Sequence, residues 1–200
     1  TSSVQAVQGV TYPALSELNG NDREFGDGYE RIVRMLSFVI FPVMLGFVAI
    51  APDMFMLLLG EKWMPTVPYF KILALSGLFY PLAIVSYNVL KTKSDGRVIV
   101  RLEIIKRVIM TAVLCYTIPQ SVEAIAWGMT TMAAVEFMLN TGVAMRYMNT
   151  TFGSLLRTIA PSFCIATIMF GALYIMTPHL AELSDAMRLG IMTVVGGALY

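Results

Sequence analysis

The sequence is poor in charge, histidine and cysteine, and each scarcity excludes a class of protein. Only 14% of the 200 residues are charged, whereas soluble domains carry about a quarter. The single histidine lies at no workable spacing from a serine or cysteine nucleophile, and Cys115 and Cys164 lack the spacing of metal ligands. No acidic cluster suggests a metal and no glycine-rich loop suggests a phosphate site. We therefore expect no enzyme activity, no metal and no cofactor.

Apolar residues, in contrast, make up 57% of the chain, and the mean hydropathy is +0.71. That is too apolar for one soluble core with a wettable surface, so the composition predicts an integral membrane protein in contact with the lipid bilayer. The net charge of +1 gives no reason to expect a nucleic-acid partner. Both cysteines fall inside apolar runs, where we expect small buried side chains.

Apolar runs long enough to cross a bilayer recur along the chain. A transmembrane helix needs about 20 such residues, and the turns between the runs are short and rich in Asn, Gly and Pro. The prediction is an all-α, polytopic transmembrane helical bundle, a single membrane domain over residues 1–200. The chain starts without Met and stops within an apolar run, so we expect a fragment cut at both ends. The expected helices cover residues 1–15 (a tail), 35–52, 67–90, 98–118, 124–148, 155–176 and 186–200 (truncated).

The positive charges alternate between the two sides of this predicted bundle. Eleven of the fourteen Lys and Arg residues fall on one side and three on the other, which marks the richer side as cytoplasmic. The loop around residues 90–97 is therefore expected inside, and residues 61–68 outside. The cytoplasmic set is Arg23, Arg31, Arg34, Lys91, Lys93, Arg97, Arg101, Lys106, Arg107, Arg146 and Arg157; the other set is Lys62, Lys71 and Arg188.

Lys106 and Arg107 are too deep in the third complete helix to be explained by topology alone. Arg107 lies about 13 Å past the start of a helix at residue 98, near the middle of the membrane. Glu103 stands three and four residues before them, so we expect all three on one helical face. Such a trio is either a structural ion-pair cluster or part of a hydrated path for an anionic substrate. The substrate-path candidates are Arg101, Glu103, Lys106 and Arg107.

Glu136 is the other unusual charge, at the middle of the fourth complete helix with Asn140 one turn later. No basic residue lies within a turn, so this acid must be protonated or find a partner on another helix. It is the candidate for coupling transport to a proton gradient; the alternative is a protonated acid hydrogen-bonded to Asn140 or to a backbone carbonyl. Asp53, at the outer end of the first complete helix, is expected to be interfacial.

Several motifs resemble the polysaccharide transporter family, the Wzx-type oligosaccharide flippases of the superfamily that includes the multidrug and toxin extruders. The resemblance covers most of the chain, and LLLGEKW at residues 57–63 is its most specific piece. The other matching pieces are Tyr12-Pro13-Ala14-Leu15-Ser16, Phe41-Pro42, Ala51-Pro52, Lys71-Ile72-Leu73-Ala74 and GRVIVRLEIIKRV at residues 96–108.

This resemblance implies a bundle of two lobes, with the chain forming most of the C-terminal lobe, and cytoplasmic loops where the cation count puts them. It also implies a flippase that moves polyprenyl-diphosphate-linked oligosaccharide from the inner to the outer leaflet of a bacterial inner membrane, for polysaccharide or lipopolysaccharide export. Polysaccharide polymerase and assembly proteins are further candidate partners. Two alternatives stay open: a cation-coupled multidrug or metabolite exporter of the same superfamily, and a non-transporting membrane subunit of a glycan-assembly complex.

Overall fold

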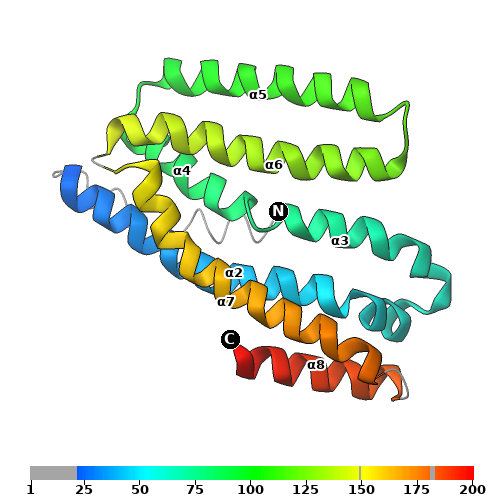
Figure 1. The fold of residues 1–200 in the computed structure, drawn as a ribbon. Helices are drawn as coiled ribbons and strands as arrows, with labels where there is room; N and C mark the ends of the chain where they lie inside the picture. Colours follow the sequence, from blue (N-terminus) through cyan, green and yellow to red (C-terminus); the bar gives the residue numbers. More distant parts are fainter. Residues whose placement is uncertain (1–21, 149, 181–182) are drawn as a thin grey trace.

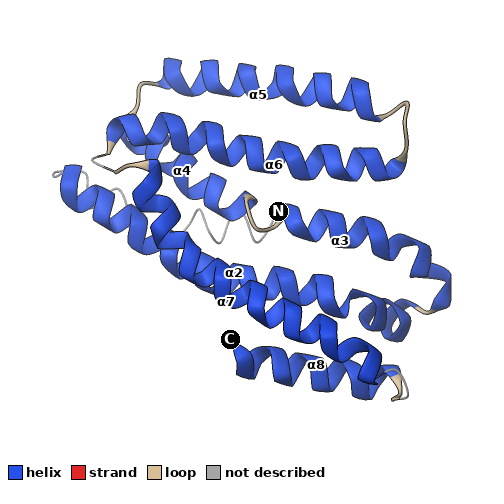
Figure 2. Ribbon diagram, in the orientation of Figure 1, coloured by secondary structure: helices blue, strands red, loops and turns tan. Residues whose placement is uncertain are grey.

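The described part of the structure, a computed structural model, is helical throughout apart from its turns (Figure 2). It covers residues 22–148, 150–180 and 183–200, so the helix expected over residues 1–15 lies outside the described residues. The α-helices are α2 (Asp22–Leu59), α3 (Val67–Ser76), α4 (Tyr80–Lys93), α5 (Gly96–Thr117), α6 (Val122–Ala144), α7 (Phe152–Met176) and α8 (Asp185–Leu199). Short 3₁₀ helices cover Glu61–Thr66, Met145–Tyr147 and Thr177–Leu180.

The helices are arranged as a row in which each packs mainly on its neighbours (Figure 1). Helix α5 lies along α6, α6 packs on α3 and α4, these pack on α2, and α2 packs on α7 and α8. Helix α5 therefore forms one edge of the row, with one side against α6 and another side that no other described helix covers.

Helix α2 is longer than the sequence predicted, beginning at Asp22 rather than at residue 35 and ending at Leu59 rather than at residue 52. Its N-terminal extension is charged, but every fourth residue there is buried against the bundle, which keeps the segment helical. The helix ends where Gly60 adopts a positive φ of 84°, a conformation that favours glycine. The buried side chains that follow this four-residue spacing along α2 are Phe25, Tyr29, Val33, Ser37, Phe41 and Leu45.

The helix expected over residues 67–90 is divided into α3 and α4 by a turn at residues 77–79. Pro81, in the first turn of α4, has no N–H to donate to the carbonyl of Gly77, so a continuous helix would lose that bond. Gly77 also lies against α2, where a Cβ would come within 2.5 Å of the Met44 sulfur. The break therefore has a local cause that the sequence contains.

The outer surface of the bundle is apolar, as expected for helices that face lipid. Large apolar side chains such as Leu58, Ile168 and Val194 are exposed. Cys115 and Cys164 are exposed as well, so the prediction that they are buried is wrong. Lipid-facing positions are as apolar as interior ones, and an apolar run therefore does not reveal which side of a membrane helix is inside.

Within residues 22–148, 150–180 and 183–200, four helical segments are long and apolar enough to cross a membrane: Glu24–Leu59, Glu61–Lys93, Val122–Tyr147 and Phe152–Leu180. The chain is thus an all-helical, polytopic membrane bundle. Segment 98–118, predicted as a complete span, forms α5 but is not one of the four. Helix α5 has the required length, but Arg101, Glu103, Lys106 and Arg107 give its middle too much charge.

Candidate functional site

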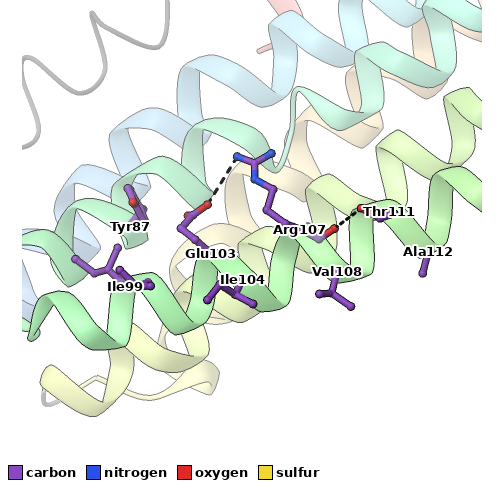
Figure 3. A pocket seen from close by; sticks show the side chains of 9 residues that line it. Tyr87, Ile99, Glu103, Ile104, Arg107, Val108, Thr111 and Ala112 are labelled. Atoms are coloured by element: carbon purple, nitrogen blue, oxygen red, sulfur yellow. Dashed lines mark hydrogen bonds and ion pairs between the residues drawn. The ribbon is translucent and has the colours of Figure 1, made fainter.

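The open side of α5 carries a groove that contains two of the predicted site residues. It has a volume of about 850 Å³ and is lined almost entirely by one face of α5, with Tyr87 of α4 at its side (Figure 3). We call it the α5 groove. Its lining residues are Tyr87, Ile99, Val100, Glu103, Ile104, Arg107, Val108, Thr111 and Ala112.

Lys106 points away from this groove into the bundle. Its side chain is 7% exposed, it forms an ion pair with Glu103, and its Nζ lies 5.0 Å from the centre of the Tyr87 ring. Lys91 lies over the same ring, also at 5.0 Å, so Tyr87 contacts two ammonium groups. The ion pair with Glu103 compensates the charge of Lys106, and the ring contact makes the side chain part of the packing between α4 and α5.

Arg107 lies on the exposed side instead, with 76% of its side chain accessible. Its guanidinium is 3.7 Å from Glu103, and its backbone carbonyl accepts a hydrogen bond of 2.9 Å from Thr111 (Figure 3). The expectation that Glu103, Lys106 and Arg107 share one face is therefore wrong in part, because consecutive residues point about 100° apart around a helix. Glu103 lies between the two cations and contacts both.

Arg101 is exposed on α5 but does not line the groove. Two of the four substrate-path candidates, Glu103 and Arg107, therefore line the groove. A third, Lys106, does not line it and is buried in the packing between α4 and α5. The groove is apolar apart from these charges, Thr111 and the Tyr87 hydroxyl. Such a surface suits a molecule with one anionic group and an apolar portion.

Glu136 lies on α6, half-buried and away from the α5 groove. It makes no ion pair or side-chain hydrogen bond with another described residue. Asn140, which we considered as its partner, donates instead from Nδ2 to the carbonyl of Ala83 on α4, at 3.1 Å. Among the described residues, the hydrogen bond that we considered between Glu136 and Asn140 is therefore not formed.

A buried ion pair that sequence reasoning missed connects α2 to α8. Asp53, which we expected at the membrane interface, is buried inside the bundle: its side chain is 4% exposed, and it pairs with Arg188, which also contacts Asp185 at 3.1 Å. The sequence contains no local signal for this pair, because its members are 135 positions apart. It joins the ends of the two helices that the cation count places outside.

Three hydroxyls form a second polar connection that the sequence did not reveal. The Ser86 hydroxyl on α4 is 2.8 Å from the Tyr29 hydroxyl on α2 and 2.8 Å from the Thr141 hydroxyl on α6. All three residues are fully buried, so these bonds fix the relative positions of three helices. Across the described residues, no group of three His, Cys, Asp or Glu side chains could hold a metal ion.

Comparison with known proteins points to polysaccharide biosynthesis. Residues 1–68 match a family model described as polysaccharide biosynthesis protein. The teichuronic acid biosynthesis protein TuaB of Bacillus subtilis is 23% identical over 198 residues, which cover 96% of this chain and 40% of TuaB. No solved structure gives a significant match.

A second relative comes from Klebsiella pneumoniae and is described as an uncharacterized membrane protein in cps region. It is 29% identical over 108 residues, which are 54% of this chain and 22% of the relative. The chain thus spans between about a fifth and two fifths of the length of the curated relatives it matches. It is a multi-pass membrane protein similar to proteins of polysaccharide and teichuronic acid biosynthesis.

Proposed function

We propose that the chain is part of a transporter that flips polyprenyl-diphosphate-linked oligosaccharide from the inner to the outer leaflet of a bacterial inner membrane. Transport would occur by alternating access between two lobes, with this chain forming most of the C-terminal lobe. The similarity to polysaccharide biosynthesis proteins supports the substrate class. Polysaccharide polymerase and assembly proteins are the partners that this function would require.

The observation that carries the proposal is the exposed arginine at the centre of α5. Arg107 is about 16 Å from the start of a helix that is itself about 33 Å long. An exposed guanidinium at that depth costs at least about 2.5 kcal/mol in hydrocarbon, so this face requires water or polar groups in front of it. A hydrated cleft between α5 and a second lobe provides both, and its positive charge would attract a diphosphate.

The direct test is transport by the complete protein in proteoliposomes. Fluorescent polyprenyl-diphosphate oligosaccharide in the outer leaflet should become inaccessible to an impermeant quencher faster than in protein-free vesicles. Uptake of cationic dyes without glycan transport would favour the multidrug exporter. Transport of neither substrate would favour a non-transporting assembly subunit.

The orientation gives a separate prediction. A cysteine that replaces Ser94, in the turn before α5, should not be labelled by an impermeant thiol reagent in whole cells. A cysteine that replaces Met64, in the 3₁₀ helix after α2, should be labelled. The exposed native cysteines, Cys115 and Cys164, are first replaced by Ala. Labelling at Ser94 from outside the cell would reverse the topology.

Glu136 supports a proton-coupled mechanism as a second candidate. It is a half-buried acid in a membrane helix and makes no ion pair or side-chain hydrogen bond with another described residue, so its carboxyl group is available to contact different groups in each of two conformations. Glu136→Gln keeps the shape and hydrogen-bonding capacity but cannot release a proton. We expect this variant to insert normally, to lose gradient-driven accumulation and to retain downhill exchange. Normal accumulation between about pH 5.5 and 8 would exclude coupling through Glu136.

A further inference from the structure

A second groove lies between α2 and α7, on the other side of the bundle from α5. It has a volume of about 530 Å³, within the range of ligand sites, and we call it the α2–α7 groove. Helix α2 contributes Glu30, Arg34 and Phe38, which are spaced by one turn and share a face. Helix α7 contributes a face that runs from Ser154 through Arg157 to Ile165.

No other described residue pairs with either arginine in this groove. Arg34 and Arg157 are exposed, and neither forms an ion pair or side-chain hydrogen bond with another described residue. The acid beside them, Glu30, is held by α7: Ser154 donates to one carboxylate oxygen at 2.6 Å, and Thr158 donates to the other at 3.3 Å. The groove therefore carries a net positive charge, with its guanidinium donors available for an anion.

The groove changes from polar to apolar along its length. No charged residue follows Arg34 until Asp53, and none follows Arg157 within α7. Both arginines thus stand where their helices enter an uncharged stretch, which is where the membrane interface lies. Beyond them, Phe38, Pro161 and Ile165 continue the groove toward the hydrocarbon.

From this arrangement we propose that the α2–α7 groove binds a membrane lipid by its phosphate headgroup. Arg34 and Arg157 would hold the phosphate oxygens, since a planar guanidinium matches phosphate geometry, and the first part of the tail would lie against Phe38 and Ile165. The lipid would come from the leaflet on the arginine-rich side. This inference does not rest on the transport proposal, because a lipid can bind here whether or not the protein moves glycans.

The test measures binding to the complete protein in detergent by titration in native mass spectrometry. The probes are dioctanoyl phosphatidylglycerol, farnesyl diphosphate and inorganic pyrophosphate. We expect at least one of the two lipids to bind more tightly than pyrophosphate, and Arg34→Gln/Arg157→Gln to weaken that binding about tenfold. A matched control, Arg31→Gln/Arg97→Gln, removes two exposed arginines outside the groove and should change affinity less than about twofold.

Because Arg34 and Arg157 are exposed and pair with no other described residue, the double variant should fold, and gel filtration checks this. If it aggregates, Arg157→Gln alone is titrated with the same probes. Equal lipid affinity in wild type and variant would overturn the proposal. Pyrophosphate binding as tight as lipid binding would also overturn it, since the site would then recognise free phosphate and not an amphiphile.

Discussion

Arg107→Gln is expected to slow the proposed flipping of lipid-linked oligosaccharide strongly, while leaving the abundance and thermal stability of the protein unchanged. The side chain is mostly exposed, and Glu103, its one ion-pair partner among the described residues, keeps its ion pair with Lys106 in the variant. Folding therefore does not depend on Arg107. A charge that lines a hydrated path acts on the passing anion, and removing it should slow transport by about two orders of magnitude. The proteoliposome quenching assay measures the rate.

Two further variants make this result specific. Arg107→Lys keeps the positive charge and should retain part of the activity, although an ammonium cannot form the paired bonds of a guanidinium. Arg97→Gln removes an exposed cation near the start of the same helix, outside the α5 groove, and should transport normally. Wild-type transport by Arg107→Gln would remove this residue from the mechanism.

Lys106 should behave differently from its neighbour. Lys106→Gln leaves Glu103 without its closest cation and removes the contact with the Tyr87 ring, so it should destabilise the protein by about 2 kcal/mol. Neutralising Glu103 as well should restore much of that stability. The pair of results separates a structural ion pair from a substrate contact, although the two cations are adjacent in the sequence.

Helix positions followed from hydropathy because local physics determines them. The expected helices at residues 98–118, 124–148 and 155–176 correspond to α5, α6 and α7, with ends that differ by a few residues. The division of residues 67–90 was also encoded locally, in Gly77 and Pro81, although the apolar run concealed it. The long N-terminal part of α2 was missed because its charges suggested a loop, whereas the four-residue spacing of Phe25, Tyr29 and Val33 indicated a helix.

Side-chain partners were less predictable, since they depend on how helices face one another. The spacing of Glu103 and Lys106 predicted their ion pair, but nothing local shows that Lys106 faces inward and Arg107 outward. The exposed cysteines illustrate the same limit, because apolar residues occur on both sides of a membrane helix. Contacts between distant helices, such as the Tyr29–Ser86–Thr141 bonds, have no signature within either helix alone.

The buried pair of Asp53 and Arg188 should have the largest effect on stability. Arg188→Met leaves the nearly inaccessible carboxylate of Asp53 without its partner, in contact with an apolar helix bundle. Breaking such a pair from one side costs about 3–5 kcal/mol, and the loss should appear as early unfolding in a detergent titration followed by circular dichroism. Asp185→Asn, which removes the more exposed partner of Arg188, should cost less than about 1 kcal/mol.

The double variant Asp53→Leu/Arg188→Met distinguishes two contributions to the free energy of unfolding: the cost of a buried charge that has lost its partner (a stranded charge), and the stabilisation by the ion pair itself. With both charges gone, α2 and α8 can pack through apolar side chains, and most of the stability lost in Arg188→Met should return. Asp53→Asn alone should be milder than Arg188→Met, because Arg188 is partly exposed and keeps Asp185. If the double variant is as unstable as Arg188→Met, the pair itself stabilises the association of α2 with α8, and the stranded-charge explanation is wrong.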